Sequence, residues 1–85
     1  RLFNLNIEID FSILESVHLN FNILKFIQNN SFSRFINLKV LELNQNQIAK
    51  LEVDSFKNLE KLEKLDLSNN QIKQLKPGIF KDLKQ

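Results

Sequence analysis

Three side chains that could ligate a metal ion recur at one spacing along the chain. His18, Glu42 and Asp66 follow one another at intervals of 24 residues, and a transition-metal ion needs several such ligands converging on one point. If the chain folds as a stack of 24-residue turns, the three side chains lie on consecutive strands. A solvated polar column whose charges partly pair explains the same spacing, and we expect that arrangement, with no metal and no cofactor.

Little else in the sequence could support catalysis. The chain has one His and no Cys, and it contains no phosphate-binding loop and no nucleophile elbow. Asn29-Asn30-Ser31 is a formal N-glycosylation sequon, which makes Asn29 a candidate glycan carrier. We therefore expect a protein that is not an enzyme.

The charged residues exclude some classes of partner. The 12 basic and 10 acidic residues are spread along the 85-residue chain, with a formal net charge of +2. No cluster of basic residues in the sequence indicates nucleic acid or an anionic membrane. No apolar run approaches the roughly 20 residues that span a bilayer. We expect neither nucleic acid binding nor direct membrane contact from this segment, and the sequence indicates no oligomeric state.

The dominant feature is an internal repeat, which also explains the spacing of the polar residues. Apolar residues at seven offsets and Asn at an eighth recur after 24 and after 48 residues. The first block carries them at Leu14, Val17, Leu19, Asn22, Leu24, Ile27, Phe32 and Phe35. The repeat predicts units at 14–37, 38–61 and 62–85.

Each unit is predicted to contribute one short strand. The spacing LxxLxL places alternate apolar side chains on one side, as with Val17 and Leu19. Stacking equivalent turns gives a parallel sheet with strands about 4.8 Å apart. No single turn can close a core, so each repeat depends on its neighbours. An amphipathic helix or coiled coil over 51–67 would not explain the 24-residue period.

Two further columns are predicted to be structural. Asn can donate and accept hydrogen bonds at once, so we expect an Asn ladder that joins the turns of adjacent repeats: Asn22, Asn46 and Asn70. A second column is expected to fill the wider convex half of each turn: Phe32, Phe56 and Phe80.

The pattern LxxLxLxxNxLxxL, continued by xxxxFxxL, resembles the leucine-rich repeat family over residues 14 to 83. The block at 62–80, which ends in Pro77-Gly78-Ile79-Phe80, is the most similar. It looks like repeats of extracellular animal proteins such as Toll-like receptors, Slit and the variable lymphocyte receptors. The resemblance implies an α/β solenoid, a right-handed superhelix with a short parallel β-sheet on its concave face. Its convex segments would be mostly irregular or short helical.

The ends of the chain depart from the repeat. Residues 1–13 are expected to form an irregular preceding repeat or N-terminal segment, and the alternation of Ile7, Ile9, Phe11 and Ile13 with polar residues favours an extended conformation. Neither end carries a capping sequence, and the family's usual Cys-rich caps are absent. We expect the chain to be a fragment of a longer solenoid.

The concave face is the recognition surface that the resemblance implies. Its candidate binding residues are Ser16, His18, Asn20, Phe21, Val40, Glu42, Asn44, Lys64 and Asp66. Phe21 and Val40 are notable because they are apolar where the pattern predicts exposure, and exposed aromatics are enriched in binding hot spots. Phe21 could instead cover the irregular first repeat.

The functional expectation is a protein-binding recognition module that meets a protein ligand or co-receptor through the concave sheet. The Phe-containing repeat favours an extracellular or cell-surface receptor or a secreted protein, and an innate-immune role is one possibility. An intracellular scaffold or adaptor in the cytoplasm, and a set of structural spacer repeats, remain alternatives.

Overall fold

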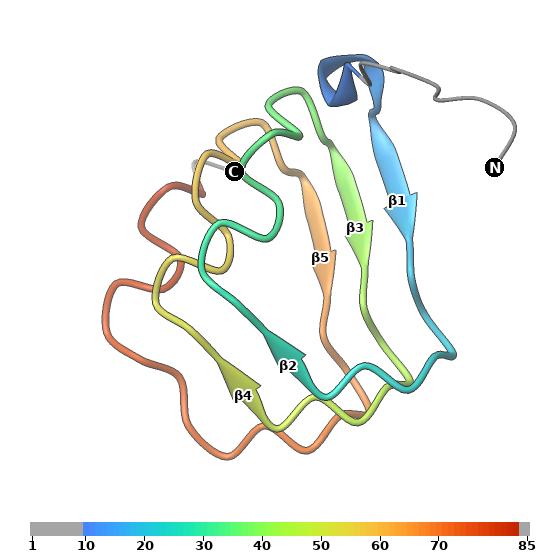
Figure 1. Cartoon of the computed structure of the whole chain (residues 1–85), viewed down its shortest axis with the longest axis vertical. Helices are drawn as coiled ribbons and strands as arrows, with labels where there is room; N and C mark the ends of the chain where they lie inside the picture. The colour runs from blue at the N-terminus through green and yellow to red at the C-terminus, as the bar shows by residue number, and fades with distance from the viewer. Residues whose placement is uncertain (1–9, 84–85) are drawn as a thin grey trace, which may run out of the picture.

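Short parallel strands, grouped into two sheets, organise the structure. The computed structural model describes residues 10–83. A three-stranded sheet has the order β1-β3-β5, and a two-stranded sheet pairs β2 with β4 (Figure 1). The strands are β1 (Ser16–His18), β2 (Phe26–Ile27), β3 (Val40–Glu42), β4 (Lys50–Leu51) and β5 (Lys64–Asp66).

The register of both sheets is the 24-residue period of the sequence. Val17 pairs with Leu41 and Leu41 with Leu65, while Ile27 pairs with Leu51 in the second sheet. Each turn of the chain therefore lies beside the equivalent residues of the next turn, which confirms the predicted stack of repeats with a short parallel sheet. Along each strand, side chains alternate inward and outward because successive Cβ atoms point to opposite faces of a sheet.

The core runs between the two sheets and is tightest in the middle repeat. Leu41, Leu43, Ile48 and Leu59 are completely buried, and Leu38 is 1% exposed. Their counterparts in the first and third repeats are less buried, because only the middle repeat has a neighbour on both sides. Full burial of one such side chain contributes about 1.5–3 kcal/mol.

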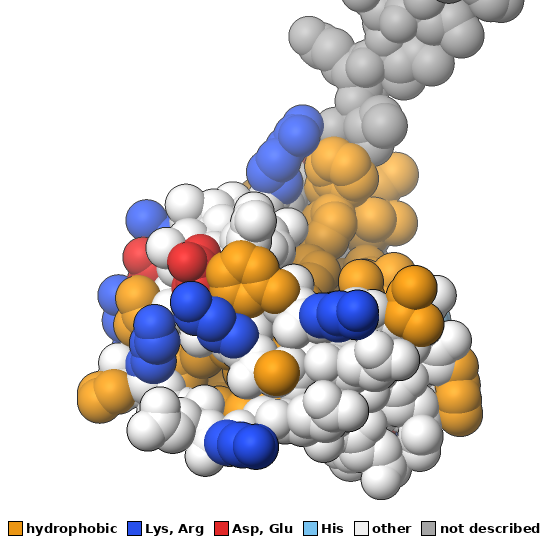
Figure 2. Space-filling model, turned by 60° about the horizontal axis from the view of Figure 1, so that its bottom comes forward, with side chains coloured by type: hydrophobic (Ala, Val, Ile, Leu, Met, Phe, Trp, Pro, Cys, Tyr) orange, Lys and Arg blue, Asp and Glu red, His pale blue; other side chains and the backbone are white. Residues whose placement is uncertain are grey.

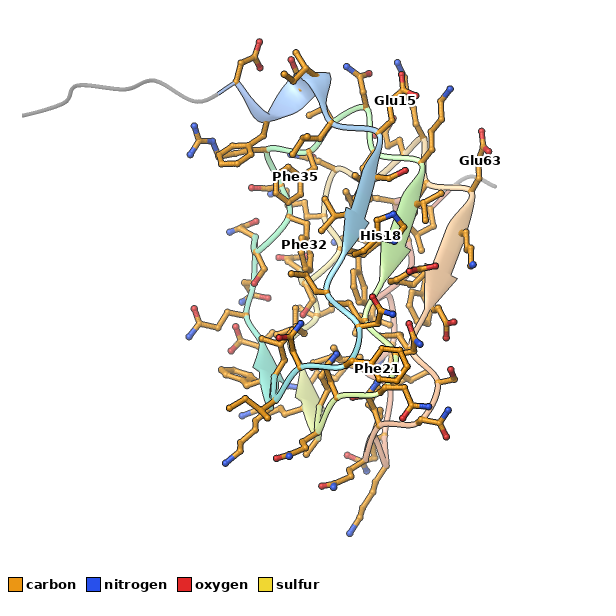
Figure 3. The ribbon with its side chains drawn as sticks, turned by 90° about the vertical axis from the view of Figure 1, so that its right-hand side faces the viewer. Glu15, His18, Phe21, Phe32, Phe35 and Glu63 are labelled. Carbon is orange, nitrogen blue, oxygen red and sulfur yellow. The ribbon has the colours of Figure 1, made fainter. Side chains whose placement is uncertain are left out.

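Aromatic rings fill the part of the interior that faces away from the main sheet. The ring centroids of Phe32 and Phe56 lie 6.4 Å apart with planes 5° from parallel, and those of Phe56 and Phe80 lie 5.9 Å apart. Figure 3 shows Phe32 and Phe35 between β1 and the returning chain. Phe56 is 1% exposed, whereas Phe80 at the end of the stack is 36% exposed.

The returning segments are mostly turns and irregular chain, as expected, apart from two short strands. They contain the strands β2 and β4, and within residues 10–83 no α-helix occurs, so the helical part of the predicted α/β class is absent there. The two-residue strands arise because Ile27 and Leu51 turn inward at the same offset, which aligns their backbones for pairing. No helix in this part of the chain is long and apolar enough to cross a bilayer.

The segment before β1 is helical rather than extended at its end. Phe11–Ile13 form a 3-10 turn, η1, where alternation favoured an extended chain, and Ile7 and Ile9 lie outside the described residues. The Asp10 carboxylate accepts hydrogen bonds from the Ser12 N–H (3.0 Å) and hydroxyl (2.6 Å), which closes the turn. The Phe11 ring then packs edge-on against Phe35 at 4.9 Å.

Candidate binding surface

The outward side chains of β1, β3 and β5, together with Asn20, Phe21 and Asn44 in the turns that follow, form one surface, which we call the sheet face. The register places Ser16, Val40 and Lys64 in one row and His18, Glu42 and Asp66 in the next. Asn20, Phe21 and Asn44 come after the strands, where the Phe21 N–H donates to the Asn44 carbonyl at 3.1 Å. Six of the nine sequence-predicted binding residues therefore lie on the paired strands, and the other three lie in the turns after β1 and β3.

An ion network crosses the centre of the sheet face. The Nδ1–H of His18 donates to Glu42 Oε1 at 2.6 Å, and Lys64 Nζ lies 3.3 Å from Glu42 Oε2. The hydrogen bond from His18, then that from Lys64, lowers the pKa of the Glu42 carboxyl. The Glu42 side chain is 21% exposed and the His18 ring, labelled in Figure 3, is 56% exposed. A fixed negative charge thus lies between two accessible donors.

Asp66 does not join this network. Its Oδ1 accepts hydrogen bonds from the Ser68 hydroxyl at 2.7 Å and the Ser68 N–H at 3.0 Å. These two bonds, the hydroxyl's first, lower the pKa of Asp66. Lys64 takes the place beside Glu42 instead. Among residues 10–83, no group of three or more His, Asp and Glu side chains is arranged to hold a metal ion.

Asn46 and Asn70 connect adjacent turns beneath the sheet face. Asn46 Oδ1 accepts from the Leu24 N–H at 3.1 Å, and its Nδ2 donates to the Leu19 carbonyl at 3.0 Å. Asn70 Oδ1 accepts from the Ile48 N–H at 2.9 Å in the same way. Asn22 is different, since its Nδ2 donates only within its own turn.

The residue before each of these Asn side chains has a left-handed backbone. The φ angles are 59° at Phe21, 58° at Gln45 and 57° at Asn69. Asn tolerates this region, whereas a bulky side chain at positive φ is an outlier. Phe21 is also 72% exposed, and Figure 3 shows it projecting away from the ribbon.

Sequence reasoning missed two exposed apolar residues near Phe21. Ile23 is 75% exposed and Phe26 is 39% exposed. Both counterparts in the middle repeat, Gln47 and Lys50, are exposed although repeats flank them on both sides. These positions of the repeat therefore face solvent. The sequence could have shown this, because the middle repeat has polar residues where the first repeat has Ile23 and Phe26.

Asn44 carries an unsatisfied acceptor on the sheet face. Its Oδ1 is buried and has no hydrogen-bond partner among the described residues. A buried acceptor without a donor costs about 1–3 kcal/mol.

Asn29 lies away from the sheet face, two residues after the end of β2. Its side chain is exposed, and its Oδ1 accepts from the Asp54 N–H at 2.9 Å. Within residues 10–83, no hydrogen bond engages Nδ2, the atom to which a glycan would attach. The Ser31 hydroxyl of the sequon donates to the Gln28 carbonyl at 2.7 Å.

Comparison with known proteins identifies the repeat. A family described as leucine rich repeat matches the chain over residues 12–72 and again over 36–85. A search of curated proteins found no match to the chain. Repeats of this kind are typically non-catalytic protein-binding modules. On the matched residues and the stacked 24-residue turns, the chain belongs to the leucine-rich repeat family.

Proposed function

We propose that the chain is a protein-recognition module that binds its partner through the sheet face. Phe21 is the observation that carries this proposal. It combines high exposure with a backbone conformation that costs a bulky residue about 1–2 kcal/mol. The turn imposes this conformation in every repeat, but only the first repeat carries a bulky residue there, whereas Gln45 and Asn69 occupy the other two positions. Aromatic side chains supply much of the energy at protein interfaces.

The rest of the sheet face fits the anatomy of a protein interface. Val40 adds apolar surface beside the polar network of His18, Glu42 and Lys64. An apolar anchor beside oriented polar groups gives affinity and direction together.

The proposal extends to the class of protein. We infer an extracellular or cell-surface recognition module, from a receptor or a secreted protein, with an innate-immune role as one setting. The similarity of the repeat to those of extracellular animal proteins and the free Nδ2 of Asn29 favour this setting. An intracellular scaffold is the second candidate, and a spacer made of structural repeats is the third.

Site-selective photo-crosslinking tests whether the sheet face is the contact surface. A benzophenone side chain replaces Ser16 in one variant and Lys57, which lies away from the sheet face, in a matched variant. We expect a partner from the source tissue to crosslink at position 16 and not at position 57. Equal yields at both positions would argue against the sheet face, and crosslinking at neither would favour the spacer interpretation.

The compartment is tested independently by glycopeptide mass spectrometry of the natural protein. A glycan on Asn29 would support the extracellular assignment. A parent protein with an unmodified Asn29 and no disulfide would favour the intracellular scaffold.

A further inference from the structure

The edge of the molecule formed after each sheet strand has its own electrostatic character. This turn edge comprises the equivalent residues 20–28, 44–52 and 68–76. It holds four Lys and one acidic residue, Glu52, whereas the eight other basic residues of the chain are outnumbered by nine acidic ones. The Glu52 carboxylate accepts a hydrogen bond from the Asn29 N–H at 2.7 Å. Figure 2, with this edge turned forward, shows basic and hydrophobic side chains across it. Acidic and basic residues are interleaved along the sequence, but in the folded protein acidic residues are scarce on this edge.

The third returning segment does not pair with β4 as β4 pairs with β2. The Ala49 N–H donates to the Lys25 carbonyl and the Glu52 N–H to the Ile27 carbonyl, at 3.0 and 3.1 Å. After the Gln71 N–H bond to Ile48, no backbone hydrogen bond joins 73–76 to β4 within the described residues. In Figure 1 this segment runs apart from β4.

Leu75 lies at the open end of the stack, within this unpaired segment. It is 52% exposed, whereas its counterparts Ile27 and Leu51 are 5% and 3% exposed. The offset between β4 and 73–76 leaves a pocket of about 520 Å³ on the turn edge. The pocket is therefore a consequence of the missing third strand of the second sheet.

Three lysines line this pocket together with apolar residues. The lining residues are Ala49, Lys50, Leu51, Lys73, Gln74 and Lys76. Within residues 10–83, none of the three ammonium groups has a carboxylate within 4.0 Å, although Lys50 Nζ lies 5.4 Å from the centre of the Phe26 ring. Three uncompensated positive charges around one concavity repel one another, and an anion between them would remove that repulsion.

We propose that this pocket binds a small polyvalent oxyanion, a molecule that carries several phosphate or sulfate groups. Ammonium groups bind such groups as point charges through charge-assisted hydrogen bonds. Gln74 supplies an amide donor, and Ala49 and Leu51 supply an apolar floor for the carrier of the anionic groups. The site is separate from the sheet face, so oxyanion binding and protein binding can be tested independently.

Isothermal titration calorimetry at low ionic strength, with two probes, tests the proposal. Inositol hexakisphosphate presents phosphate groups and sucrose octasulfate presents sulfate groups. The variant carries Lys73→Gln and Lys76→Gln, and the matched control carries Lys57→Gln and Lys61→Gln, which remove the same charge outside the pocket. Circular dichroism establishes that both variants remain folded, and amide chemical shifts locate the bound probe.

We expect at least one probe to bind the natural chain and the control, and to bind the pocket variant at least about tenfold more weakly. Amide shifts should concentrate at residues 49–51 and 73–76. The probe with the higher affinity would show which of the two presented anions the pocket prefers. Binding of neither probe, or an equal loss in the pocket and control variants, would overturn the proposal.

Discussion

Replacing Asn46 by Leu removes the side-chain hydrogen bonds through which this residue joins the first and second repeats beneath the sheet face. Asn46 is 8% exposed, and its Oδ1 is the acceptor for the Leu24 N–H. Its Nδ2 donates to the carbonyls of Leu19, Leu43 and Asn44 at 3.0, 2.9 and 3.2 Å. Leucine has a similar volume, so the change removes polar contacts and leaves little empty space.

The expected cost follows from which groups lose every partner. The Leu24 N–H is left without its acceptor, which costs about 1–3 kcal/mol. The carbonyls of Leu19 and Leu43 still accept hydrogen bonds from Asn22 and Asn70. Losing the bonds from Asn46 to these two carbonyls therefore adds only about 1–2 kcal/mol. After the gain from burying an apolar side chain, we expect Asn46→Leu to lower the free energy of unfolding by about 2–4 kcal/mol.

Asn22→Leu is the matched control. Asn22 occupies the same offset, but its Nδ2 donates only to the carbonyls of Leu19 and Asn20 and its side chain is exposed. Water can replace these bonds, so the control should lose no more than about 1 kcal/mol. The chain has no Trp and no Tyr, so urea unfolding is best followed by far-ultraviolet circular dichroism. Equal losses in the two variants would refute the ladder, since of these two side chains Asn46 bonds across repeats and Asn22 does not.

Three further predictions concern the aromatic and charged positions. Phe21→Asn should raise the free energy of unfolding by about 1 kcal/mol, because Asn tolerates the left-handed conformation; a lower urea midpoint would contradict this. The bonds from His18 and Lys64 lower the pKa of folded Glu42 below its ordinary value of 4.5, so the stability they contribute is present above that value and is lost as the pH falls through the folded-state pKa. Urea midpoints from about pH 6 to about pH 3 should therefore fall less steeply for Glu42→Gln than for the natural chain, and parallel profiles would count against the network. Phe56→Ala should cost about 3–5 kcal/mol and Phe80→Ala clearly less, because Phe80 is 36% exposed; similar losses in calorimetric melting would show that the stack does not depend on burial.

The main sheet could be predicted from the sequence, because the 24-residue period of the sequence is also the register between neighbouring strands. Apolar residues at offsets such as Val17, Leu41 and Leu65 define both which side chains turn inward and which strands are neighbours. The second sheet was not predicted, because two-residue strands leave no alternation to detect. The helical turn at Phe11–Ile13 was also missed, since a local bond from Ser12 to Asp10 overrode the alternating pattern.

The candidate sites were predicted only in part. The rows of the sheet face follow directly from the 24-residue register, but the partners within a row do not. Asp66 is at the right offset for the network, yet its carboxylate accepts hydrogen bonds from Ser68 instead. The lysine pocket depends on where 73–76 separates from β4, which is a property of packing that the linear distribution of charges conceals.

Phe21→Asn also provides the most direct test of the central claim, that the sheet face recognises a protein partner. The substitution should preserve or raise stability while it removes the exposed ring, so loss of binding cannot be attributed to unfolding. The measurement is the affinity of the crosslinked partner for the natural chain and for this variant, by surface plasmon resonance. We predict an affinity at least about tenfold weaker for the variant, in keeping with an interface anchor. An unchanged affinity in a folded variant would contradict the claim.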